Sequence, residues 1–377
     1  MQKHPKNNSK KLDIISSSKR KKVAIIGTNG LPPRYGGFET LANYLTDYLK
    51  DSFDFIVYCS KTPRNQRILS YNNARLVYLP LKANGWQSII YDAICILHAW
   101  LSADELLILG NSGAFILPLK VFFGKKIITN IGGIDWQRNK WNYFERKFIE
   151  ICETICIRFS DKVITDNHYI QQLYKDRYAC NSELIEYGGD QATKIEVTPE
   201  MESKYEFLGK RYFLSVNRAQ SDNNIHMLLS VFEKLPQHLL VVISNWDSSE
   251  YGKKLKQQYK GRFSNIFIVD AIYDEFLLDM IRSNAWIYIH SQSFCGTAPS
   301  LVEVMNLGIP IICYGAKTNR VTTENKCEYF ENELQLEKII LSLDNEKLGQ
   351  IASDVYEIAK RRYRWSVIAR EYARVLG

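Results

Sequence analysis

The 377-residue sequence has no uninterrupted apolar run of the roughly 18 residues that a membrane-spanning helix needs. The best candidate, SIIYDAICILHAWL, is shorter and contains Asp92. The N-terminal segment MQKHPKNNSKKLDIISSSKRKKV is basic but lacks the apolar stretch of a secretory signal. We therefore expect a cytoplasmic protein, soluble or peripheral to a membrane, with a flexible basic arm at its N-terminus.

Two further signals are missing. The eight cysteines include no CxxC pair, and several lie in apolar runs, so a reduced cytoplasm fits better than a disulfide framework. The first glycine loop, GTNGLPPRYGG at 27–37, does not have the GxGxxG spacing of a dinucleotide fingerprint. A nicotinamide-dependent oxidoreductase is thereby disfavoured.

The charge that is present is mainly positive, with 49 Lys and Arg against 41 Asp and Glu. The surplus is concentrated in the arm, at Lys125 and Lys126, and from Arg138 to Lys147. Such charge suits anionic lipid or phosphate partners, although a solvated surface is the commoner cause. We expect no nucleic-acid partner.

Short apolar runs alternate with amphipathic segments along the chain. VAIIGT at 23–28 is followed by the glycine loop and then by GFETLANYLTDYLK, whose apolar residues recur at spacings of three and four. Further runs extend to LIEY at 184–187, and the pattern restarts with YFLSVN at 212–217. Apolar strands that alternate with helices predict two α/β units with buried parallel sheets.

Domain boundaries follow from this recurrence and from the polar stretch between the two units. Parallel sheets bind ligands beyond the carboxyl ends of their strands, so two facing sheets form a cleft between their loops. The predicted parts are a flexible basic arm at 1–20, a first Rossmann-like domain at 21–195, a second at 196–360, and a C-terminal helix at 361–377 that could cross back to the first.

Gly36 and Gly37, just before the first helix, would let backbone N–H groups approach a phosphate or sugar closely. A plain turn fits their spacing equally well. In HSQSFCGTAPSLVEVMNLGIP at 290–310, Gly296 and Thr297 precede Pro299, a residue that suits a first helical turn. The segment predicts an anion site at a helix N-terminus.

Three side chains near these loops are candidates for donor contacts. Glu303 could accept hydrogen bonds from ribose hydroxyls, and Arg218, just after YFLSVN, could clamp a diphosphate. His290 could stabilise the departing phosphate or orient a sugar. Each also has an ordinary structural interpretation, as a solvated glutamate, a surface arginine and a buried histidine.

Five motifs in order resemble glycosyltransferase family 4, and within it the bacterial rhamnosyltransferase-like enzymes of capsule and O-antigen assembly. The motifs are IIGTNGLPPRYGGFET, IGGIDWQRNKW, SVNRAQSDNNIHMLL, HSQSFCGTAPSLVE and YRWSVIAREYARVL. The resemblance covers about residues 22 to 377. It implies a GT-B fold, with an acceptor-side first domain and a second domain that binds the nucleotide sugar. It also implies a retaining hexosyltransferase without cofactor or metal, acting on a glycan acceptor. The basic arm and the cluster around Arg138 suggest contact with the inner face of the plasma membrane, where a lipid-linked acceptor would lie.

The resemblance also implies roles for individual residues. Arg218 and the Gly296–Thr297 loop would hold the donor diphosphate, and Glu303 the ribose. Asp135, with the basic segment Arg138 to Lys140, would lie on the acceptor side, unless the tryptophan-rich loop around it merely packs. The remaining substrate-binding residues that it implies are Gly36, Gly37, Asn224, Pro299, Ser300 and Leu301.

Two departures from the general family pattern leave the donor open. Many members carry a glutamate at the position of Cys295 and a lysine at the position of Asn223. The rhamnosyl subgroup resembles this sequence at both places. Two alternatives are a sugar-nucleotide epimerase, which needs no acceptor, and a non-catalytic protein that binds nucleotide sugars or glycans.

Overall fold

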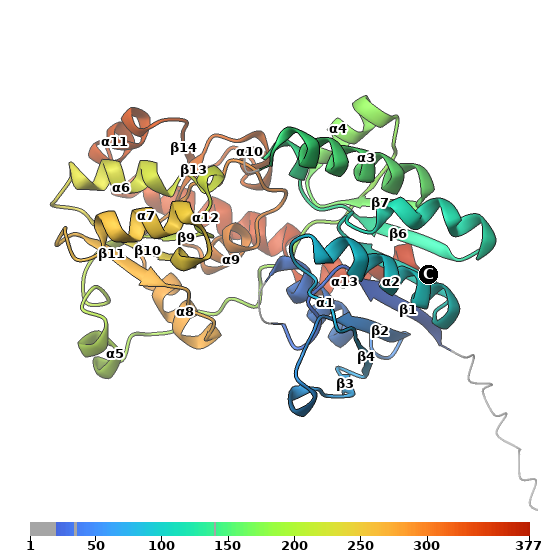
Figure 1. Ribbon diagram of the computed structural model, residues 1–377. Coiled ribbons are helices and arrows are strands. Elements are labelled where there is room, and N and C mark those ends of the chain that lie inside the picture. Colours follow the sequence, from blue (N-terminus) through green and yellow to red (C-terminus); the bar gives the residue numbers. More distant parts are fainter. Residues whose placement is uncertain (1–19, 34–35, 139–140) are drawn as a thin grey trace, which may run out of the picture.

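The computed structural model describes residues 20–33, 36–138 and 141–377, which form two α/β domains side by side (Figure 1). The first contains an eight-stranded sheet in the order β3-β4-β2-β1-β5-β6-β7-β8, parallel except for the β3–β4 pair. Its strands are β1 (Lys21–Ile26), β2 (Phe53–Cys59), β3 (Ser70–Tyr71), β4 (Ala74–Tyr78), β5 (Glu105–Leu109), β6 (Lys126–Asn130), β7 (Lys162–Thr165) and β8 (Glu183–Leu184).

Helices cover both faces of this sheet (Figure 1). Four are α-helices, and a longer 3-10 helix, η2 (Ala114–Phe122), follows β5. The α-helices are α1 (Gly37–Tyr48), α2 (Gln87–Ser102), α3 (Tyr143–Phe159) and α4 (His168–Tyr178). Short 3-10 helices lie at Arg64–Gln66 (η1) and Asp135–Gln137 (η3).

The second domain repeats the plan with six parallel strands in the order β11-β10-β9-β12-β13-β14. These are β9 (Tyr212–Val216), β10 (Leu239–Ser244), β11 (Ile266–Asp270), β12 (Ile287–His290), β13 (Ile311–Tyr314) and β14 (Glu328–Phe330). In chain order the strands of this sheet run third, second, first, fourth, fifth, sixth, which is the doubly wound arrangement. The first sheet likewise places its first strand beside a later one, β5, at the point where the strand order reverses. The predicted pair of α/β units with parallel sheets is confirmed.

The remaining helices pack on the second sheet or close the chain. They are α5 (Pro199–Lys204), α6 (Ile225–Glu233), α7 (Glu250–Tyr259), α8 (Glu275–Ser283), α9 (Pro299–Leu307), α10 (Lys317–Thr322), α11 (Glu333–Leu341), α12 (Asn345–Arg362) and α13 (Trp365–Leu376), with 3-10 turns η4 (Ser221–Asn223) and η5 (Trp246–Ser248). In the described residues, no helix has the length and apolar character needed to cross a membrane.

The ends of individual elements follow local chemistry. Helix α9 has Pro299 in its first turn and ends at Gly308, which adopts a φ of 66°, a left-handed conformation that favours glycine. One expected strand is shorter than its apolar run predicts. LIEY at 184–187 pairs only at its start, because Ile185 and Tyr187 bury their side chains in the core between the domains after the chain leaves the sheet.

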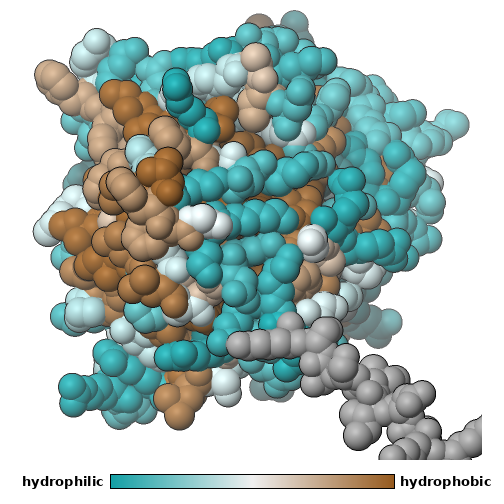
Figure 2. Space-filling view, turned by 90° about the vertical axis from the view of Figure 1, so that its right-hand side faces the viewer, coloured by the Kyte–Doolittle hydropathy of each residue, from teal (hydrophilic) through white to brown (hydrophobic). Residues whose placement is uncertain are grey.

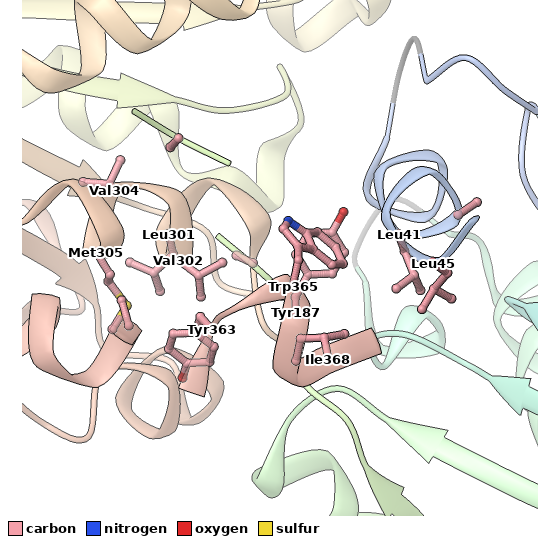
Figure 3. Packing of buried hydrophobic residues seen from close by; sticks show 14 of the residues in the cluster. Leu41, Leu45, Tyr187, Leu301, Val302, Val304, Met305, Tyr363, Trp365 and Ile368 are labelled. Carbon is pink, nitrogen blue, oxygen red and sulfur yellow. The ribbon is translucent and has the colours of Figure 1, made fainter. Parts of the chain in front are cut away.

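The chain passes between the domains twice, and the two crossings are bonded to each other. Gly189 N donates to Tyr363 O (2.9 Å), and Trp365 N donates to Asp190 Oδ1 (2.8 Å). The Trp365 ring stacks on Tyr44 of α1, with 4.4 Å between ring centroids. It also lies edge-on to Tyr187, next to which Figure 3 shows it. The final helix α13, which begins at Trp365, therefore packs on the first domain although it follows the second.

Further contacts hold the end of α13 against the first sheet. The Lys21 ammonium donates to Leu376 O (3.0 Å), and Lys126 donates to Val375 O (2.8 Å). Cations at a helix C-terminus complement its partial negative charge. The Tyr372 hydroxyl accepts a bond from the Asn130 amide (2.7 Å).

Gly188 is required at the first crossing, because a Cβ there would overlap the buried Trp365 ring. We expect Gly188→Ala to lower the free energy of unfolding by about 1–3 kcal/mol, the usual cost of overpacking a core. The matched control is Gly349→Ala in α12, where a Cβ meets nothing within 4 Å. It should raise stability by about 0.5–1 kcal/mol. Urea denaturation measures both, and equal effects would contradict this packing.

Candidate functional site at the domain interface

The loops at the carboxyl ends of the two sheets meet directly. A Cβ added to Gly133, after β6, would lie 3.4 Å from Gly296 N, after β12. A Cβ added to Gly37, at the start of α1, would lie 3.4 Å from Pro299 Cγ, in the first turn of α9. Gly37 and Pro299, two of the residues predicted to bind substrate, thus lie close together in a closed arrangement of the domains.

The predicted anion loop of the second domain lies against the end of β7. A Cβ at Gly296 would overlap the Asp166 carboxylate, so only glycine fits there. The Thr297 hydroxyl donates to the carbonyl oxygen of Asp166. Gly296 and Thr297 are both buried in this contact.

Asp166 was not singled out from the sequence. Burial raises the pKa of its carboxyl group to about 7, although a hydrogen bond from the Thr297 backbone opposes this shift. Its Oδ1 atom has no hydrogen-bond partner in the described part of the chain. An acidic residue that directly follows the apolar run VIT is the signal that could have identified it, because that position is the ligand-binding edge of a parallel sheet.

Arg138 joins the two domains from the loop after β6. Its Nε donates to Asp222 Oδ2 (2.6 Å), and its Nη2 donates to Gln220 Oε1 (2.6 Å), both in the loop after β9. Arg138 and Asp222 are both buried. Asp135 Oδ1 lies 3.5 Å from Arg138 Nη1, and the Asp135 side chain is half exposed. Residues 139 and 140 of the predicted basic segment lie outside the described residues.

Arg218 follows β9 and is exposed. Its guanidinium group has no hydrogen-bond or ion-pair partner in the described part of the chain. Its carbonyl accepts a bond from the Asn223 amide (2.7 Å), which orders the loop. An ordered backbone with a free guanidinium group is suited to an anionic ligand.

Asn224 is buried and has a left-handed φ of 51°. Its side-chain amide donates to Ser291 O (3.0 Å), so it ties the loop after β9 to the loop after β12. These two strands are adjacent at the point where the strand order reverses, which is where ligands bind in doubly wound sheets.

Cys295 lies close enough to Asp166, Arg218 and Arg138 for their charges to act on its thiol. Burial, reinforced by the charge of Asp166, raises the pKa of its thiol to about 12, while Arg218 and Arg138 act in the opposite direction. The thiol is therefore neutral at physiological pH and unsuited to act as a nucleophile.

Glu303 extends from α9 into a polar network. Its Oε2 pairs with Arg282 Nη2 (2.6 Å), and its Oε1 accepts from Gln191 Nε2 (2.7 Å). Gln191 in turn accepts a bond from the Trp365 indole (2.7 Å), which connects the predicted ribose contact to the domain crossing. Each carboxylate oxygen has two lone pairs, so Glu303 keeps capacity for a ligand hydroxyl. Burial raises its pKa, and Arg282 opposes the shift.

His290 ends β12 and is fully buried. Burial lowers its pKa to about 3, so the ring is neutral at physiological pH. Asn319 is the polar side chain near the ring and opposes this shift, although in the described part of the chain neither ring nitrogen meets the geometry of a hydrogen bond. The ring does not reach solvent in this arrangement, and its contact with a donor stays a prediction.

The glycine loop of the first domain is held by Glu39, a second residue that the sequence reasoning missed. Its buried carboxylate accepts from Asn29 N (2.7 Å) and from the Asn29 side chain (2.8 Å). A Cβ on Gly36 would lie 2.7 Å from Glu39 Oε2, so a larger residue at this position would displace the end of the Glu39 side chain. The Gly37 carbonyl accepts a bond from the Tyr187 hydroxyl (2.5 Å).

Two family models match successive parts of the chain. Residues 20–190 match a domain of unknown function, DUF1972, and residues 197–349 match glycosyl transferases group 1. A search of curated proteins finds no match.

Solved structures match almost the whole chain. Sucrose-phosphate synthase from Thermosynechococcus elongatus superposes with a TM-score of 0.79 at 15% identity, covering 95% of this chain and 98% of that one. HepE from Anabaena, in complex with UDP and glucose, gives 0.73 at 14% identity and covers 95% and 99%. The chain has the GT-B fold. The second domain of this GT-B chain is the part that matches glycosyl transferases group 1.

A different activity also occurs among GT-B neighbours. A putative UDP-N-acetylglucosamine 2-epimerase from Listeria monocytogenes superposes with a TM-score of 0.62 at 13% identity, covering 95% of both chains. At these identities the structural likeness defines the fold, and substrate and reaction depend on the site itself.

The buried carboxyl group of Asp166 should make stability depend on pH. Its pKa rises from 3.8 to about 7 on folding, so the folded state holds one more proton than the unfolded state between these values. Stability therefore falls as pH rises through this window. The wild type should therefore lose free energy of unfolding between pH 5 and pH 8. We expect this decrease to be about 2–3 kcal/mol smaller in Asp166→Asn, since one pKa unit corresponds to about 1.4 kcal/mol.

Urea denaturation at the two pH values measures this difference. The control Asp51→Asn, at an exposed position, should keep the pH dependence of the wild type. An Asp166→Asn variant with the same pH dependence as the wild type would show that the carboxyl group is solvated.

Proposed function

We propose that the protein is a retaining glycosyltransferase that moves a sugar, with rhamnose favoured, from a nucleoside-diphosphate sugar to a surface polysaccharide. The observation that carries this proposal is the exposed Arg218 guanidinium group, which has no hydrogen-bond or ion-pair partner among the described residues and acts on Cys295 in the glycine loop that precedes α9. Both lie at the point of strand reversal in a group 1 domain. A capsule or O-antigen chain, lipid-linked at the inner membrane face, is the proposed acceptor.

The donor diphosphate would bind where the N-terminus of α9 meets Arg218. Backbone N–H groups of Gly296 and Thr297, the helix dipole and the guanidinium group would together stabilise the negative charge of the leaving group. Glu303 would accept ribose hydroxyls, and Pro299, Ser300 and Leu301 would lie beside the sugar. The first domain would contribute Gly36 and Gly37 from the opposite side.

Retention would follow from attack on the same face of the sugar that the diphosphate leaves. The acceptor hydroxyl oxygen bonds to C1 as the bond from C1 to the phosphate oxygen breaks, and the electron pair stays with the diphosphate. The hydroxyl proton passes to that phosphate oxygen, so the step needs no separate base. Asp135, half exposed beside Arg138, would orient the acceptor, and neutral His290 would support the floor of the donor site from below.

Entry of the donor requires the domains to separate, because the loops that would hold it are in direct contact. The Thr297 hydroxyl donates to Asp166 O, and Arg138 bridges to Asp222. Closure around bound substrates would exclude water and prevent hydrolysis of the donor.

The donor site is tested by Arg218→Ala. Charge-assisted hydrogen bonds of about 1.5–3 kcal/mol would be lost, so transfer should fall by about 10-fold or more. The matched control is Arg262→Ala, an exposed arginine in the turn after α7, which should leave transfer unchanged. The assay offers dTDP-rhamnose and UDP-hexoses with a lipid-linked acceptor. Unchanged turnover and donor affinity in Arg218→Ala would refute this placement.

Metal independence is a separate prediction. Because Arg218 and the α9 N-terminus are proposed to stabilise the leaving diphosphate, transfer should continue at an undiminished rate after treatment with EDTA. If EDTA lowered the transfer rate and added Mg²⁺ or Mn²⁺ restored it, a metal ion would be shown to stabilise the leaving diphosphate instead.

An epimerase is the second candidate, favoured by the Listeria neighbour. It would convert the nucleotide sugar without an acceptor, whereas a transferase consumes donor only when acceptor is added. A non-catalytic binding protein would bind the donor without consuming it. Product analysis with and without acceptor separates the three activities.

A further inference from the structure

Helix α2 exposes an apolar stripe on the side that faces away from the core. The stripe residues are Trp86, Ile90, Ile94, Leu97 and Leu101, which are between 41% and 81% exposed. Their spacing of three and four residues places them along one side of the helix. The opposite side is also apolar, and it packs into the core of the first domain.

Two neighbouring elements widen this stripe. Helix α3 packs against η2, and η2 contacts α2. Their exposed apolar residues are Phe115, Leu119, Val121 and Phe122 on η2, and Tyr143, Phe144, Phe148 and Ile151 on α3. We call these residues and the α2 stripe the apolar face. Figure 2, which views the molecule from the side of the first domain, shows apolar surface gathered into one continuous area.

An exposed surface of this extent needs an explanation. Soluble monomers seldom expose a contiguous apolar area larger than a few hundred Å², and larger areas mark interaction surfaces. Single exposed apolar side chains are ordinary, but here three adjacent elements contribute to the same area.

Charged residues border the apolar face. Lys125 follows η2, and Lys147 and Arg158 lie on α3, which also carries Glu145 and Glu150. Lys147 pairs with Glu150 (2.8 Å), so Lys125, Arg158 and the chain before β1 supply the positive charge that remains. The only acid within α2, Asp92, is buried. The sequence before β1 adds the cations of the basic arm.

The apolar face extends from the attachment of the arm to the edge of the site. Leu101 and Phe122 come just before β5 and β6, whose first residues, Glu105 and Lys126, lie beside Lys21 at the start of β1. At the other end, Trp86 lies two residues after Asn84, whose amide bonds to Asn29 in the glycine loop (3.2 Å). A partner on this face would therefore reach the edge of the proposed acceptor side.

We infer that the apolar face docks onto the surface of an anionic lipid bilayer. Apolar side chains would enter the boundary between headgroups and acyl chains, while Lys125, Arg158 and the cations of the arm pair with lipid phosphates. A second copy of the chain is the less suitable occupant, because a two-fold contact would bring together two chains that each have a net charge of +8. Docking itself does not depend on the proposed function. Its proposed role, which is to bring a lipid-linked acceptor to the site, rests on that function.

The test measures vesicle binding without any sugar donor. Wild-type protein is floated with vesicles of phosphatidylcholine, with or without phosphatidylglycerol. Leu101→Ser with Phe122→Ser removes two of the most exposed side chains, at 81% and 79% exposure. The matched control, Tyr273→Ser with Phe276→Ser, removes two aromatic side chains exposed by 68% and 57% on the second domain.

We expect the wild type and the control pair to float with the anionic vesicles, and the Leu101 and Phe122 pair to bind at least about tenfold more weakly. Thermal unfolding verifies that both pairs remain folded. Failure of the wild type to bind anionic vesicles, or equal binding by both pairs, would overturn the inference. A dimer in sedimentation that only the Leu101 and Phe122 pair loses would assign the face to a second copy instead.

Transfer to a detergent-solubilised acceptor is measured in parallel. The Leu101 and Phe122 pair should transfer at the wild-type rate in this assay, because neither residue lies in the proposed donor site. Transfer without vesicle binding would contradict only the docking inference. Vesicle binding without transfer would contradict only the proposed function.

Discussion

The close contact between Asp166 and Gly296 determines how the two sheets face each other. A carboxylate at the end of β7 occupies the space that a side chain at position 296 would fill, so the glycine loop of the second domain can lie directly against the first. The Arg138–Asp222 pair and the hydrogen bond from the Thr297 hydroxyl to Asp166 O bridge the same interface. Breaking a buried pair of this kind by removing one partner is costly, but separating the domains rehydrates both charges. The ion pair can thus stabilise the closed interface, while opening the interface to admit a ligand leaves neither charge buried.

A second set of contacts keeps the domains connected when that interface opens. Trp365 stacks on Tyr44 of the first domain, and its indole donates to Gln191, which also bonds to Glu303. A movement of the domains at the crossings would therefore shift Gln191 and, through it, the proposed ribose contact Glu303. This arrangement physically connects the hinge to the donor site without requiring any change within either sheet.

Much of the architecture could be predicted from local patterns. The alternation of apolar runs with amphipathic segments indicated two parallel sheets, and Pro299 and Gly308 marked the ends of α9. The ion pair between Arg282 and Glu303, and the approach of Asp166 to Gly296, could not be predicted in this way. Their partners are distant in sequence, and no local rule states which loops meet when two domains close. The exposed stripe on α2 could not be predicted for a related reason. A helix that is apolar on both sides has the sequence pattern of a fully buried helix.

The central claim is that the second domain holds the nucleotide through Arg218 and the N-terminus of α9. A crystal structure of the protein with a nucleoside diphosphate, UDP or dTDP, tests it most directly. The account predicts phosphate oxygens within hydrogen-bond distance of the Arg218 guanidinium and of the Gly296 and Thr297 backbone N–H groups, with the ribose hydroxyls at Glu303. A nucleotide bound instead to the glycine loop at 27–37 of the first domain, with Arg218 free, would contradict it.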